Sequence, residues 1–279
     1  MRASRFLMTL MFALAWGACG PAPETTTRPP TPVPDTKEAF YKIGHQFYVN
    51  QNFDSADVYL KKASLMDASY LAPLNELAQM HYALGMQQSE EKNPKRLDHF
   101  KKSFGYFVRL ESHGSKDSEI YERLSELSNT LSDNKSLVKY AKRNAEAYPY
   151  ERQYFNLGFA CFQVGDYQNV IKTQKEATEK FKGSTYIGSF YRQLGRAYVK
   201  IDRDQTAERT FDAGLKAVDA VVAELKKSSN NYTSSEEYRR LVDDKVGMLI
   251  SLKSLHQTYN AEEKLQKVEQ QLKDVGYSK

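Results

Sequence analysis

Two segments of the chain repeat one residue pattern, and this repeat constrains the fold more than any other feature of the sequence. Tyr154–Tyr167 and Tyr191–Gly214 both read aromatic-x-x-Leu-Gly, then a turn, then the start of a second run. Leu157 and Leu194 lie 37 residues apart, which is the length of one helical hairpin and its connections. A single hairpin cannot bury the apolar stripes of its two helices, so neighbouring hairpins must stack on one another.

The second copy continues with Ala207, Phe211 and Gly214, a small residue followed at four and seven positions by an aromatic and another small residue. On these residues the chain resembles tetratricopeptide repeat proteins, whose period is about 34 residues. The resemblance implies an all-α fold, an α-α superhelix or solenoid of about five to six helical hairpins over residues 37–275. It also implies that small residues lie where two helix backbones approach closely. The alternative is an irregular helical bundle with chance periodicity.

With this pattern as a guide, further copies can be recognised on both sides of the two clear ones. A first repeat begins at Phe40, a second at Leu74, a third at Tyr121 and a sixth at Val246. We expect Leu84-Gly85 at the turn of the second repeat. The residues that carry these copies are Phe40, Ile43, Gly44, Phe47, Phe53, Ala56, Leu60, Ala63, Leu74, Leu77, Ala78, His81, Tyr121, Leu124, Leu137, Ala141, Val246, Leu249, Ile250, Ala261, Leu265 and Val268.

Two polar stretches interrupt the helical pattern. One follows Gly85 and ends at Pro94, which suits the first turn of a helix beginning near Lys95. The other is residues 226–235 (KKSSNNYTSS). Both are expected to be solvated loops, and the alternative is that one of them contacts a partner, because loops often carry function.

The N-terminus is typical of an exported protein. Arg2 and Arg5 precede an apolar run, residues 6–16, which is too short to be a permanent membrane span. Small residues then lead into Cys19, and this stretch resembles a bacterial lipobox, although Trp16 stands where that family usually has leucine. The resemblance implies a signal peptide over residues 1–18 and a mature chain that begins with an acylated Cys19, carrying fatty acids such as palmitate. The alternative is an ordinary secretory peptide cleaved nearby.

Residues 19–36 are expected to tether the folded part to that anchor. Residues 20–36 hold six of the nine prolines in the chain and almost no core-forming side chain. Such a segment favours extended polyproline II and could reach on the order of 50 Å at ~3.1 Å per residue. The lipoprotein resemblance favours the outer membrane of a bacterial envelope, because Gly20 is not the aspartate that retains lipoproteins in the inner membrane. Whether the protein faces the periplasm or the cell surface stays open.

Charge, cysteines and motifs exclude several classes of function. The net charge is +5, and the charged residues of both signs are interspersed along the chain, which gives no sign of nucleic-acid binding. Cys161 lies on the apolar stripe of its helix and is interpreted as a small buried residue. Asp202–Asp204 is interpreted as a turn, since the rest of a calcium loop is missing. No catalytic, metal or cofactor motif occurs, so we expect no enzyme activity, no metal and no cofactor.

In tetratricopeptide proteins the first helix of each hairpin lines a concave face that binds proteins or peptides. Applied to this chain, the resemblance implies partner-binding residues in five repeats. Arg192, Arg196 and Lys200 share one helical face beside three phenylalanines, which predicts a pocket for an acidic group or a C-terminal carboxylate with an apolar neighbour. The alternative is that these cations are solvated and the phenylalanines belong to the core. The implied residues are Tyr41, His45, Tyr48, Asn75, Gln79, Tyr82, Glu122, Glu126, Asn129, Phe155, Phe159, Phe162, Arg192, Arg196 and Lys200.

These features together predict a non-enzymatic scaffold or adaptor anchored in the bacterial envelope. Small outer-membrane lipoproteins of similar architecture support β-barrel assembly and pilus secretion, so the same setting is expected here. Two alternatives stay open. One is a surface-exposed lipoprotein that binds host or environmental ligands, and the other is an enzyme with an unrecognised site at helix ends.

Overall fold

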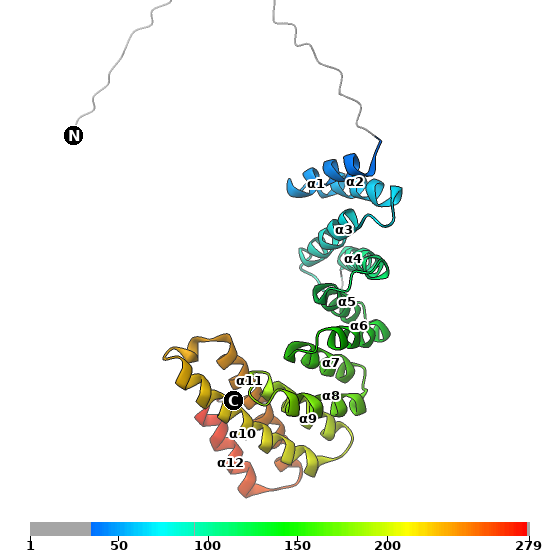
Figure 1. Ribbon diagram of the computed structural model, residues 1–279. Helices are drawn as coiled ribbons and strands as arrows, with labels where there is room; N and C mark the ends of the chain where they lie inside the picture. Colours follow the sequence, from blue (N-terminus) through cyan, green and yellow to red (C-terminus); the bar gives the residue numbers. More distant parts are fainter. Residues whose placement is uncertain (1–34, 92, 278–279) are drawn as a thin grey trace, which may run out of the picture. The chain divides into compact units, whose positions relative to one another are not determined.

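The computed structural model describes residues 35–91 and 93–277; the predicted signal peptide, Cys19 and all of the predicted tether except its last two residues lie outside these ranges. The described residues form twelve α-helices and one short 3₁₀-helix, with no β-strand (Figure 1). The α-helices are α1 (Lys37–Val49), α2 (Phe53–Met66), α3 (Leu71–Met86), α4 (Pro94–Ser112), α5 (Ser118–Thr130), α6 (Asn134–Ala147), α7 (Glu151–Gln163), α8 (Tyr167–Lys180), α9 (Ile187–Lys200), α10 (Asp204–Ser228), α11 (Glu236–Thr258) and α12 (Glu262–Asp274), and the 3₁₀-helix is η1 (Tyr232–Ser234).

Consecutive helices pair into six hairpins, α1 with α2 through to α11 with α12. From α3 onward, the first helix of each hairpin also packs against the second helix of the hairpin before it, so that α3 contacts α2 and α9 contacts α8 (Figure 1). Each hairpin therefore buries its apolar stripes against its neighbours, as expected for stacked repeats. The predicted all-α solenoid of helical hairpins is confirmed, with six hairpins in the part of the chain that is described.

Five of the six hairpins turn in the same way. Each has one residue with a positive φ after its first helix, and only one of the five is glycine, Gly165. The next residue donates its backbone N–H to a carbonyl five positions back, as Arg203 does to Tyr198 at 2.9 Å. This bond closes the C-terminus of the helix and reverses the chain. Asp202, with φ of 56°, is the positive-φ residue between α9 and α10, so its interpretation as a turn residue is confirmed.

The small residues of the repeat lie at the contacts between paired helices, as predicted. A β-carbon on Gly195 would lie 2.3 Å from the nearest ring atom of Phe211, and one on Gly44 would lie 2.8 Å from the side chain of Leu60. The placement of Gly85 at a turn is wrong. Gly85 is buried near the end of α3, where a β-carbon would lie 2.5 Å from the ring of Phe100 in α4. It is thus a packing residue, which the sequence did not distinguish from a turn glycine.

The first interruption of the pattern ends as predicted, whereas the second is shorter than predicted. α4 begins at Pro94, where the side chain of Asn93 accepts a hydrogen bond from the backbone N–H of Lys95 at 2.9 Å. The second loop starts at Ser229, because α10 continues through Ser228. Propensity alone did not indicate these last helical residues, which are exposed and polar.

Cys161 is buried between α6, α7 and α8, with only 2% of its surface exposed. Burial raises the pKa of its thiol to about 11, so the side chain stays in its unreactive thiol form near neutral pH. The interpretation of Cys161 as a small buried residue is confirmed. None of the described helices has the length and apolarity that a membrane span requires.

Candidate protein-binding surface

The predicted binding residues of the first hairpin make contacts inside the protein, mainly with the second hairpin. Tyr41 in α1 donates a hydrogen bond to Glu76 in α3 at 2.8 Å, and Nδ1 of His45 lies 2.7 Å from the same carboxylate oxygen. Burial, and then the bond to Glu76, raises the pKa of Tyr41 to about 12. Tyr48 packs on Phe53 of its own hairpin. These side chains tie α1 to α3 and α2.

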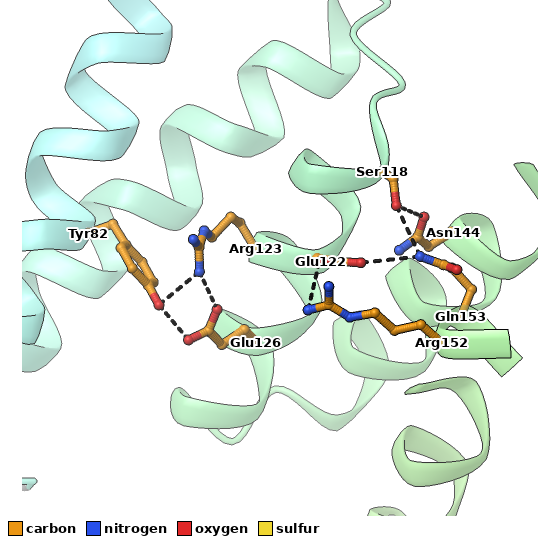
Figure 2. A network of polar contacts seen from close by, with 8 residues as sticks. All are labelled: Tyr82, Ser118, Glu122, Arg123, Glu126, Asn144, Arg152 and Gln153. Carbon is orange, nitrogen blue, oxygen red and sulfur yellow. Dashed lines mark hydrogen bonds and ion pairs between the residues drawn. The ribbon is translucent and has the colours of Figure 1, made fainter. Parts of the chain in front are cut away.

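Asn75 on α3 is exposed, whereas Tyr82 on the same helix is held by α5. Tyr82 donates a hydrogen bond to Glu126 at 2.5 Å and accepts one from Arg123 at 3.0 Å (Figure 2). Arg123 also pairs with Glu126 at 2.8 Å, and its guanidinium lies 4.3 Å from the centroid of the Tyr82 ring. Tyr82 therefore joins the second hairpin to the third through these contacts.

A second part of the same network joins α5 to α7. Glu122 pairs with Arg152 at 3.4 Å and accepts a hydrogen bond from Gln153 at 3.2 Å (Figure 2). Beside these residues lies a hollow of about 310 Å³ between α5, α6 and α7. Phe159 of α7 lines one side of it. The glutamates of the third repeat therefore border a hollow, but Glu122 and Glu126 already have cationic partners.

A second hollow, of about 490 Å³, lies between α7, α9 and α11, and Phe159 lines this one too. We call it the Arg196 hollow. Here the structure brings together the phenylalanines and the arginines that the sequence placed on neighbouring repeats. Phe159 keeps 39% of its surface exposed, so it is not a core residue. The lining residues are Phe155, Phe159, Phe162, Gln163, Tyr186, Ser189, Arg192, Gln193, Arg196, Arg240, Asp243 and Asp244.

Arg196 is the cation of this hollow that has no acidic partner among the described residues. Its guanidinium lies 4.7 Å from the centroid of the Phe162 ring, an attractive cation–π arrangement. Partial burial, followed by the charge of Arg192, lowers the pKa of Arg196. The positive charge is thus incompletely compensated, and an anion in the hollow would stabilise it.

Arg192 also lines the hollow, but it is not free. It donates a hydrogen bond to Asp244 in α11 at 3.0 Å, and Asp244 also accepts one from the hydroxyl of Ser189. Asp244 is only 4% exposed, and burial raises its pKa although Ser189 and Arg192 both oppose the rise. Arg192 therefore lines the hollow, as predicted, but it already has a carboxylate partner. It joins α9 to α11, because a buried carboxylate requires a partner.

Lys200 also lies apart from the predicted pocket. It is exposed at the end of α9 and does not line the Arg196 hollow. Of the three cations predicted to act together, the structure leaves Arg196 facing the hollow without a partner. Lys200 and Arg196 share a helical face, but the hollow ends before the last turn of α9.

The contribution of α11 was not predicted. Arg240 stacks over the ring of Tyr186 at 4.1 Å from its centroid, and Asp243 is exposed beside it. One signal in the sequence could have indicated Asp244. It follows Leu241 by three residues and precedes Met248 by four, so a carboxylate stands within an apolar stripe of the helix. A charge in that position requires a partner on the neighbouring helix.

No protein-family profile matches this sequence, and no curated protein sequence matches it. Among solved structures, the chain is similar to MamA, with a TM-score of 0.48 and 16% identity over 66% of this chain and 93% of MamA. It is similar to YrrB, described as a TPR protein with an unusual peptide-binding site, with a TM-score of 0.49 and 14% identity over 69% of this chain and 93% of YrrB. For PilF of Pseudomonas aeruginosa the TM-score is 0.44, with 13% identity over 86% of this chain and 91% of PilF.

Proposed function

We propose that this protein is a non-enzymatic scaffold that binds a segment of another protein in the Arg196 hollow. The bound segment presents an acidic side chain or a C-terminal carboxylate to Arg196 and an apolar side chain to Phe159. The observation that carries this proposal is the position of Arg196, whose guanidinium lies over the ring of Phe162 and faces the hollow without a carboxylate partner in the described part of the chain.

The energetics favour this use of the hollow. A hydrogen bond that involves a charged group contributes roughly 1.5–3 kcal/mol when the pair is shielded from water. An arriving carboxylate would also offset the repulsion between Arg196 and Arg192, which are neighbours on one helix face. The exposed part of Phe159 adds apolar surface that a partner can cover. Affinity and selectivity for an acidic, apolar segment would thus arise at one place.

Arg196→Glu should weaken partner binding tenfold or more, because it replaces an attraction for the acidic group by a repulsion. The matched control is Lys200→Glu, which makes the same charge change four residues along α9 but outside the hollow. We expect both variants to melt within a few degrees of the unmodified protein, since surface changes usually cost under ~0.5 kcal/mol. The measurement is co-purification from solubilised envelope, followed by quantitative binding to the recovered partner. Equal loss in both variants, or full retention in Arg196→Glu, would contradict the proposal.

We also propose that the scaffold is anchored in a bacterial envelope through Cys19, with the outer membrane favoured, where it supports an assembly or secretion complex. The support for this lies in the sequence: a short apolar run, small residues before Cys19, and the proline-rich residues 20–36. The helices begin at Lys37, so this tether would hold the repeats away from the membrane surface. A surface-exposed lipoprotein that binds external ligands is the competing reading.

Cys19→Ala should abolish incorporation of a fatty-acid analogue, because the cysteine sulfur is the site of acylation. Metabolic labelling of cells that produce the full-length chain measures this directly. Cys161→Ala is the control, since its thiol is buried and should not affect the label. Equal label in the wild type and in Cys19→Ala would refute lipid anchoring at this residue, while leaving the Arg196 hollow untouched.

A further inference from the structure

The outer face of the first hairpin departs from the pattern set by the second to fifth hairpins. One position of the repeat pattern comes four residues after the leucine of the aromatic-x-x-Leu-Gly motif. It is occupied by His81, Ser128, Cys161 and Tyr198 in α3, α5, α7 and α9, and all four are buried. This position lies beside the second helix of the preceding hairpin. Nε2 of His81 lies 3.1 Å from Asp57 of α2, and Lys175 of α8 lies over the ring of Tyr198.

In α1 the same position is Phe47, which is only half-buried. Among the described residues no hairpin precedes α1, so this face is covered on one side only. Phe47 stacks on Tyr59 of α2, with ring centroids 5.6 Å apart, and Phe40 and Ile43 of α1 are half-buried as well. Met66 of α2 is 49% exposed. The first hairpin thus keeps the apolar residues of an internal repeat.

The last hairpin, at the other end of the stack, has a different outer face. Terminal repeats of solenoids usually carry a polar outer face, because nothing packs on them. α12 follows this rule with exposed charged and polar residues, among them Glu263, Lys267 and Gln270. The difference between the two ends indicates that the first hairpin is not a cap.

We infer that Phe40, Ile43, Phe47, Tyr59 and Met66, the outer face of the first hairpin, form a docking site for an amphipathic α-helix of a partner protein. The occupant is a helix because a helix fills the equivalent place at each internal junction from α2–α3 to α10–α11. This surface is separate from the Arg196 hollow and goes beyond the function proposed above.

The charge on this face selects the chemistry of the helix. Nζ of Lys62 lies 5.4 Å from the ring centroid of Phe40 and 5.5 Å from that of Tyr59, and among the described residues it has no carboxylate within ion-pair distance. An acidic residue beside the apolar stripe of the incoming helix would pair with it. A partner helix that is apolar on one side and acidic at its edge therefore fits this face.

Two other occupants fit less well. A second copy docked face to face would bring two Lys62 side chains together, and like charges at an interface are unfavourable. A second copy docked end to end would offer the polar surface of α12. Residues 20–34 of the same chain hold six prolines and no apolar stripe, so they cannot supply an amphipathic helix.

A photo-crosslinking amino acid, p-benzoylphenylalanine, placed at Tyr59 of the full-length chain tests this site in the native envelope. Mass spectrometry should identify an adduct with one other protein, linked through a peptide that forms an amphipathic helix with acidic residues. Lys62→Glu should reduce this adduct tenfold or more without lowering the melting temperature. The same crosslinker at Tyr150, which is 63% exposed just before α7 in another hairpin, is the control and should give no such adduct.

The remaining outcomes also decide the matter. The inference is overturned by the absence of an adduct at Tyr59, by an adduct with a second copy or with residues 1–34, or by an adduct that Lys62→Glu leaves unchanged. The Arg196→Glu variant separates this site from the hollow on α9. Its adduct through Tyr59 should be as strong as that of the wild type, and loss of the adduct would show that the two surfaces are not independent.

Discussion

Replacing Gly195 by alanine should lower the free energy of unfolding by about 1–3 kcal/mol, the usual cost of overpacking a filled core. The added β-carbon would lie 2.3 to 2.6 Å from three ring atoms of Phe211. The ring of Phe211 is fully buried in the largest apolar cluster, so it cannot move aside without displacing its neighbours. Urea unfolding of the purified protein, followed by circular dichroism, measures the loss.

Gly105→Ala in α4 is the matched control. A β-carbon there has no atom within 4 Å, so the change should be neutral or should stabilise the helix by up to about 1 kcal/mol. In a second test, Phe211→Leu should cost less in the Gly195→Ala background than in the wild type, because the smaller side chain relieves the overlap. A neutral Gly195→Ala variant would mean that α9 and α10 do not pack in the register described.

Arg192→Glu should destabilise the protein by about 2–3 kcal/mol. Removing one partner of a buried ion pair costs about 3–5 kcal/mol, and we expect less here because the Arg192 side chain is 37% exposed to water. Asp244 would lose its cationic partner and face a second carboxylate across the contact between α9 and α11. Thermal unfolding of Arg192→Glu and Arg196→Glu side by side measures the difference between these two neighbouring arginines.

Asp244→Asn provides the rescue. In that background the buried group at position 244 is uncharged, so adding Arg192→Glu should cost less than half of what it costs in the wild type. If Arg192→Glu melts like the wild type, then Arg192 is a surface cation as the sequence suggested. A loss of partner binding in Arg192→Glu carries no information about the hollow unless its helical content is retained.

The two arginines show how far residue spacing can be interpreted. Arg192 and Arg196 lie one turn apart on α9, and helical periodicity correctly placed them on one face. Their roles differ because Asp244 of α11 pairs with Arg192, whereas Arg196 forms no ion pair among the described residues. The residue that separates the two roles lies 52 positions further along the chain than Arg192.

The sequence by itself determined the helical hairpins, their number to within one, and several of the contacts inside them. These features depend on local spacing: small and large residues such as Gly195 and Phe211 belong to one hairpin and lie 16 positions apart, so helical periodicity determines how they meet. It also indicated that the phenylalanines of α7 and the arginines of α9 would be neighbours, because adjacent repeats stack.

Only the tertiary structure decided which polar side chains are free. Tyr82 reaches Glu126 across 44 residues, Arg192 reaches Asp244 across 52, and Gly85 turned out to pack on Phe100. Each of these contacts depends on how the helices are rotated and displaced against one another. The repeat pattern determines the rotation of each helix about its axis only to within a fraction of a turn. That rotation decides whether a polar side chain is buried against a neighbouring helix or left free to bind a partner. A buried side chain must be paired within the protein, because burial makes an unpaired charge costly.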